Sequence, residues 1–153
     1  MRRSDASSLS GTSAPVVARS LALLGRNRFS LDDYERAARL LAEATLVADE
    51  AGDDQLRADT WLALASHSRT RGELPDARRQ IATARSGITR LGGDADLEVK
   101  LLREGAVCSE HEGHGAEAVA LAGVAVRRAE AAGLPALALG RGVVPHPLRE
   151  IRS

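Results

Sequence analysis

Apolar residues recur along most of this chain at the three- and four-residue spacing of amphipathic helices, and short glycine-containing turns separate them. Residues 1–13 are instead rich in serine and poor in apolar side chains, so we expect a disordered arm there. From Pro15 onwards the pattern predicts six helices and the beginning of a seventh. Because the connections contain only a few residues, successive helices are expected to lie antiparallel.

Start and stop signals bound the predicted helices. The first follows Pro15, which a first helical turn tolerates. The second begins near Ser30, whose hydroxyl can accept a hydrogen bond from an orphan backbone amide, and it stops at Ala51-Gly52. Four more helices are expected at about 54–71, 75–92, 95–112 and 116–132, with a glycine ending each one.

The predicted helices form pairs, and the pairs repeat with a period of roughly 40 residues. In each copy, a large residue and a small one in the first helix are followed by three small or apolar residues in the second. The three copies are Leu21-x2-Leu24-Gly25 with Ala37-x3-Leu41-x2-Ala44, Trp61-x2-Leu64-Ala65 with Ala77-x3-Ile81-x2-Ala84, and Leu102-x2-Gly105-Ala106 with Ala118-x3-Ala122-x2-Ala125. We expect the small residues to let paired helices approach and Trp61 to anchor the core between pairs.

This pattern over residues 15–134 resembles the tetratricopeptide repeat family, whose signature is W-x2-L-G-x2-Y…A-x3-F…P with a period of about 34 residues. The resemblance implies an all-α fold, a right-handed superhelical array of about three antiparallel helix-turn-helix repeats within residues 14–134. The sequence departs from the signature in its longer period, in Arg28, Ser68 and Ser109 at the aromatic position, and in the missing closing proline. The alternative is an Ala/Leu-rich helical bundle with accidental periodicity.

The resemblance also implies a protein-interaction scaffold, because the first helix of each pair lines a concave face in such arrays. The positions that would be open to a partner are Arg19, Arg26, Asp59, Leu62, Ser66, Arg69, Lys100, Arg103, Val107 and Glu110. This set leans basic, which favours an acidic or amphipathic peptide; the alternative is that these are merely solvated polar positions. A carboxylate clamp of the cochaperone type is not expected, since only Lys100 matches its pattern.

Composition gives little support to other partners. The chain of 153 residues carries 21 basic and 21 acidic side chains, so its formal net charge is zero. Arg2, Arg3, Arg19, Arg26 and Arg28 could form a basic end, but no aromatic platform or reading motif for nucleic acid accompanies them. A single cysteine, the lack of a secretory signal pattern and the lack of a long apolar run predict a cytoplasmic protein and no membrane span.

No combination of residues predicts catalysis, a cofactor or a metal site. His111 and His114 are three residues apart, whereas the zinc motif H-E-x-x-H places its histidines four apart on one helix face. Cys108 extends them into a ladder, but a fourth ligand is missing. His67 lies between Ser66 and Ser68 without a third orienting group, so we do not expect an enzyme.

Residues 135–153 are expected to form an incomplete helix and an irregular tail. Gly140, Gly142, Pro145 and Pro147 interrupt the seventh helical pattern, although repeat arrays need a polar cap on their last apolar face. This uncapped end predicts self-association or a longer array. Arrays with a period near 40 also resemble those attached to bacterial signalling proteins, so the alternative function is a regulatory fragment of a Ser/Thr kinase or transcriptional regulator.

Overall fold

The computed structural model describes residues 31–135, and they form an all-α array, as the sequence predicts. The helices are α2 (Leu31–Glu50), α3 (Asp54–Thr70), α4 (Leu74–Arg90), α5 (Ala95–His111) and α6 (Gly115–Ala131). They begin and end within two residues of the positions that the start and stop signals indicate. The predicted arm at 1–13, the first predicted helix with Arg19 and Arg26, and the tail at 136–153 lie outside the described residues.

Glycines in the left-handed conformation end the helices. Gly72 has φ +79° and Gly113 has φ +81°, values that L side chains adopt only with strain. The residue after each glycine donates its backbone N–H to a carbonyl of the last helical turn, Glu73 to Ser68 at 2.9 Å and His114 to Ser109 at 2.8 Å. These bonds satisfy orphan carbonyls and turn the chain back on itself within three residues.

The helix pair α3–α4 recurs as α5–α6 further along the chain. Asp54 and Ala95 begin the first helices of the two pairs, and Leu74 and Gly115 begin the second helices, so the spacing is the same for both. The helix-capping bonds recur with them: the Leu56 N–H donates to Asp53 Oδ1 at 2.9 Å, and the Leu97 N–H donates to Asp94 Oδ1 at 3.0 Å. The predicted repeat of these two pairs is therefore confirmed as a structural one.

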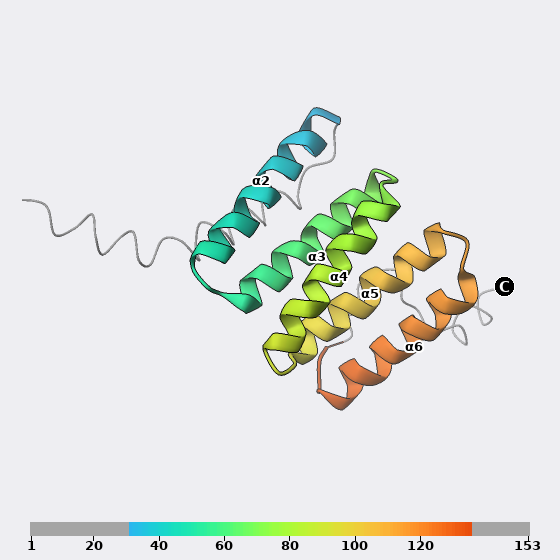
Figure 1. Cartoon of the computed structure of the whole chain (residues 1–153). Coiled ribbons are helices and arrows are strands. Elements are labelled where there is room, and N and C mark those ends of the chain that lie inside the picture. The colour runs from blue at the N-terminus through green and yellow to red at the C-terminus, as the bar shows by residue number, and fades with distance from the viewer. Residues whose placement is uncertain (1–30, 136–153) are drawn as a thin grey trace, which may run out of the picture.

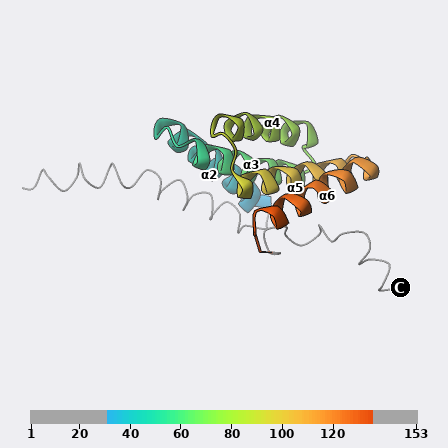
Figure 2. The same cartoon turned by 90° about the horizontal axis from the view of Figure 1, so that it is seen from below.

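The most extensive helix contacts lie within the pairs, α3 with α4 and α5 with α6. Smaller contacts join α2 to α3 and α4 to α5, and α3 also touches α5 directly. Figure 1 shows the helices side by side with α2 and α6 at opposite edges, and Figure 2 shows α4 lying over α3 and α5. The first helices of the two complete pairs are consequently neighbours in space.

Small side chains build the interior, as expected from the repeat. Ala65 and Ala77 are fully buried where α3 meets α4, together with Leu97 and Cys108 of α5. Trp61 is half-buried and packs against this cluster and also against a second one that contains Leu41. Its indole thus joins the main cluster to the cluster that Leu41 of α2 forms with Ala63 and Leu64 of α3. This is the anchoring position between α2 and the following pair that the sequence predicts.

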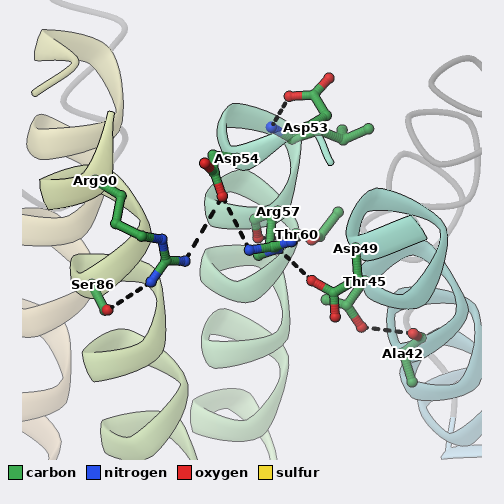
Figure 3. A network of polar contacts seen from close by, with 10 residues as sticks. Ala42, Thr45, Asp49, Asp53, Asp54, Arg57, Thr60, Ser86 and Arg90 are labelled. Carbon is green, nitrogen blue, oxygen red and sulfur yellow. Dashed lines mark hydrogen bonds and ion pairs between the residues drawn. The ribbon is translucent and has the colours of Figure 1, made fainter. Parts of the chain in front are cut away.

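A chain of charged side chains also ties α2, α3 and α4 together at one end of the array (Figure 3). Arg57 of α3 forms ion pairs with Asp49 of α2 and with Asp54, whose Oδ1 lies 3.0 Å from Arg57 Nη1. Arg90 of α4 lies 3.8 Å from the same carboxylate and donates a hydrogen bond to Ser86 Oγ at 3.0 Å. This network links three consecutive helices through side-chain contacts.

Candidate interaction face

Seven of the ten residues predicted to contact a partner lie on neighbouring surfaces of α3 and α5, and together they define the α3–α5 face. Six of them are half-buried and Glu110 is exposed. The seven are Asp59, Ser66 and Arg69 on α3, and Lys100, Arg103, Val107 and Glu110 on α5. Ion pairs join the two surfaces between Asp59 and Lys100 and between Arg69 and Glu104.

The face is built from equivalent positions of the two repeats. Lys100 lies one repeat after Asp59, and Val107 lies one repeat after Ser66. Because both helices of a pair are offset by the same interval, each position on α3 has its counterpart on α5. The two repeats differ in the side chains at these positions. Asp59 of α3 is replaced by Lys100 on α5, and Ser66 is replaced by Val107, so the α5 half of the face is less acidic and more apolar at these positions.

Lys100 holds the two repeats together at one part of the face. Its Nζ lies 3.1 Å from Asp59 Oδ1 of α3 and 2.9 Å from Asp96 Oδ2 of its own helix. Partial burial alone lowers the pKa of the Lys100 ammonium, but hydrogen bonds and charge from Asp96 and Asp59 outweigh it, so the pKa lies above its ordinary value. Lys100 is therefore positively charged and forms ion pairs with two carboxylates of this chain.

Glu104 is a buried carboxylate beside the face, and it was not among the predicted site residues. The residue is 4% exposed. Its Oε2 lies 3.4 Å from Arg69 Nε of α3, and its Oε1 lies 3.6 Å from Arg103 Nη2. A buried charge requires such partners, so Glu104 fixes the two guanidinium groups. Glu104 lies one repeat after Ala63, which is buried. The acidic residue at this equivalent position is the sequence signal that could have indicated a buried charge.

Leu62 corrects the predicted set. It was expected to be open to a partner, but it is 4% exposed and belongs to the main core cluster. Ala58 and Ala65 belong to the same cluster, and their spacing of four and three residues around Leu62 places all three on one buried side of α3. The prediction was wrong because it assigned Leu62 by its position in the repeat pattern of the family and not by its apolar side chain.

The basic character that the sequence suggested for this surface is offset by carboxylates. Lys100 lies between Asp59 and Asp96, while Arg69 and Arg103 share Glu104. An acidic ligand would have to compete with these internal ion pairs. Ser66 and Val107 are the uncharged members of the face.

Cys108, His111 and His114, the residues considered for metal binding, differ in burial. Cys108 is fully buried, and burial raises the pKa of its thiol, which disfavours the reactive thiolate. His111 and His114 are exposed instead. Within residues 31–135, no three His, Cys, Asp or Glu side chains are grouped in a way that could hold a metal ion.

His67 serves the packing of α2 against α3. Its ring centroid lies 5.5 Å from that of Tyr34, with the ring planes tilted by 48°. Burial and the nearby Arg71 lower its pKa, and its buried Nε2 has no hydrogen-bond partner among the described residues. Neighbouring Ser68 is buried, while the Ser66 hydroxyl oxygen accepts a hydrogen bond from Arg69 at 3.2 Å.

Comparison with protein-family models, with curated proteins and with solved structures found no match. Membership of the tetratricopeptide repeat family therefore stays a prediction from the sequence. In the segment from Leu31 to Pro135, no helix combines the length and apolar character that a membrane span requires.

Proposed function

We propose that this protein is an interaction scaffold that binds a peptide or a partner protein along the α3–α5 face. The single observation that carries the proposal is the direct contact of α3 with α5, the equivalent first helices of two successive repeats. These two helices run in the same direction and carry equivalent positions, so they provide regularly spaced contacts for an extended or helical ligand. Repeat arrays present binding surfaces of this kind because each repeat contacts only its neighbours.

The internal ion pairs favour an amphipathic ligand over a strongly acidic one. Lys100 and Arg69 are already paired with carboxylates, so these two residues offer a ligand little uncompensated positive charge. Ser66 and Val107 lie at equivalent positions and are half-buried, which leaves each of them partly accessible. A partner that places an apolar side chain against Val107 and polar groups along the ion pairs would match this pattern.

We further propose a cytoplasmic location for this interaction. Cys108 is the only cysteine in the sequence, and it is a buried free thiol. A fold that uses a thiol as a small apolar core residue suits a reducing compartment.

The test is peptide selection on the immobilised chain, followed by affinity measurements with a blocked variant. Ser66→Arg/Val107→Arg places two long charged side chains on the face without removing an inter-repeat ion pair. We expect it to weaken selected peptides at least about tenfold, the effect of losing roughly 1.4 kcal/mol. Ala82→Arg, at an exposed position of α4, is the control and should leave affinity unchanged.

Two results would contradict the proposal. One is a selection that enriches no peptide for the folded parent chain. The other is a set of peptides that bind the blocked variant as tightly as the parent while circular dichroism shows both proteins folded. Either result would remove the α3–α5 face as the site of binding.

A further inference from the structure

A second surface, on the exposed side of α6, is unusually apolar for its position in the array. Val119 is 56% exposed and Val124 is 41% exposed, and Ala116 and Ala120 are exposed beside them. Residues 118–126 contain no charged side chain. We define the α6 face as Ala116, Val119, Ala120, Gly123 and Val124.

The structural repeat supplies an internal control for this face, because α4 occupies the equivalent position one repeat earlier. Leu74 at the start of α4 corresponds to Gly115 at the start of α6, and the later positions correspond in order. The sequence replaces Arg78 by Val119, Arg79 by Ala120, Thr83 by Val124 and Arg85 by Val126. Two arginines and a threonine of α4 thus become apolar residues of the α6 face, and Arg79 and Thr83 show that this side of the helix is solvent-exposed in α4; Val126 is half-buried and lies outside the face.

Continuation of the array by another repeat would not account for all of these replacements. Arg78 faces the next repeat, where it donates hydrogen bonds to Glu112 at 2.6 Å and to Ser109 at 2.9 Å. A following helix would therefore contact Val119. Arg79 and Thr83 remain exposed even though α5 follows α4, so a following helix would leave Ala120 and Val124 exposed as well.

We propose that a second copy of this chain covers the α6 face, with the two α6 helices packed antiparallel across a two-fold axis. The charges that flank the apolar segment have opposite signs, Glu117 on its N-terminal side and Arg127 on its C-terminal side, and both are exposed. An antiparallel pair brings Glu117 of one copy towards Arg127 of the other, whereas a parallel pair would place like charges together.

The small residues of the face suit a crossing point between two copies. Ala120 carries only a small side chain, so the backbones of two helices can approach closely there. The Arg127 guanidinium lies beside Gly123, where an added Cβ would be 3.4 Å from its Nη1. A two-fold interface uses the same patch on both copies, which requires that the patch be complementary to itself. The apolar centre and oppositely charged ends of α6 meet this requirement. The α6 face shares no residue with the α3–α5 face.

The test is sedimentation of the full chain over concentrations up to about 200 μM, because one helix from each copy forms only a small interface. We expect a reversible monomer–dimer equilibrium in this range. Val119→Arg/Ala120→Arg gives α6 the residues that α4 carries at the equivalent positions, and it should remain monomeric throughout. The matched control Ala82→Arg/Thr83→Arg on α4 should dimerise like the parent.

A charge exchange tests the antiparallel arrangement independently of the apolar contact. Glu117→Arg should weaken the dimer about threefold to fivefold, and addition of Arg127→Glu should restore the original affinity. A parent chain that stays monomeric at about 200 μM would overturn the proposal, including the case in which a different protein covers the α6 face. A Val119→Arg/Ala120→Arg variant that dimerises like the parent, or a charge exchange without restoration, would overturn it too.

Discussion

At the scale of single side chains, Trp61 illustrates how one residue joins two repeats. Its indole packs against the main core cluster and against the cluster around Leu41, yet part of it remains accessible. We therefore expect Trp61→Ala to lower the free energy of unfolding by about 2–3 kcal/mol, somewhat less than the roughly 3–5 kcal/mol of a fully buried tryptophan. Urea denaturation at 25 °C measures this change.

The control for Trp61 is another apolar truncation that removes little packing. Leu46 is 63% exposed on α2, so Leu46→Ala should change the free energy of unfolding by less than about 0.5 kcal/mol. Equal losses for the two variants would show that Trp61 does not join the clusters.

His67 makes the stability of the array depend on pH. Burial and the charge of Arg71 lower its pKa below the ordinary 6.5. The unfolded chain consequently binds a proton more tightly than the folded chain does, and this contribution to stability is lost as the pH falls from above 6.5 towards the folded pKa. We expect the urea midpoint of the parent to fall between pH 7.5 and pH 5.5 and His67→Gln to remove part of that decrease.

His111→Gln provides the matched comparison, because it removes an exposed imidazole from the end of α5. Both variants lose one imidazole, so the comparison isolates the effect of its position. If His67→Gln and His111→Gln show the same dependence as the parent, His67 does not titrate differently in the folded and unfolded chains.

At the scale of helices, glycines at the ends and in the interior should respond to alanine with opposite signs. Gly113 has φ +81°, where alanine is strained, so Gly113→Ala should cost about 1 kcal/mol. Gly105 lies within α5, and an added Cβ would meet Leu121 Cδ1 at an ordinary contact distance of 3.5 Å. Gly105→Ala should therefore stabilise the chain by up to about 1 kcal/mol through higher helix propensity. Thermal melting measures both effects. A higher melting temperature for Gly113→Ala together with a lower one for Gly105→Ala would contradict this expectation.

The contact between α4 and α5 depends on Arg78, which is the principal polar link across that boundary in the described residues. It donates to both oxygens of Glu112 at 3.1 and 2.6 Å and holds the pKa of that carboxyl below its usual range. Both side chains remain solvated, so a double-mutant cycle with Arg78→Ala and Glu112→Ala should give a small favourable coupling. A coupling of zero would show that the pair is not formed in solution.

At the scale of the whole molecule, the sequence was sufficient to predict the helices and their repeat because local signals determine both. Asp53 and Asp94 start helices, Gly72 and Gly113 end them, and each acts within one turn of its own position. The candidate site was less predictable because it depends on contacts between residues a whole repeat apart in the sequence. Pairing of Lys100 with Asp59 and of Glu104 with Arg69 turns expected ligand contacts into links between repeats.

Nuclear magnetic resonance on the isotope-labelled chain can map the position at which a peptide binds. Titration with a peptide selected on the parent should shift the backbone amides of Ser66, Lys100 and Val107 most strongly, because these residues lie on the neighbouring surfaces of α3 and α5. The largest shifts at Thr83 of α4 or Val124 of α6, or no shifts at a saturating peptide concentration, would contradict the assignment of the α3–α5 face as the binding surface.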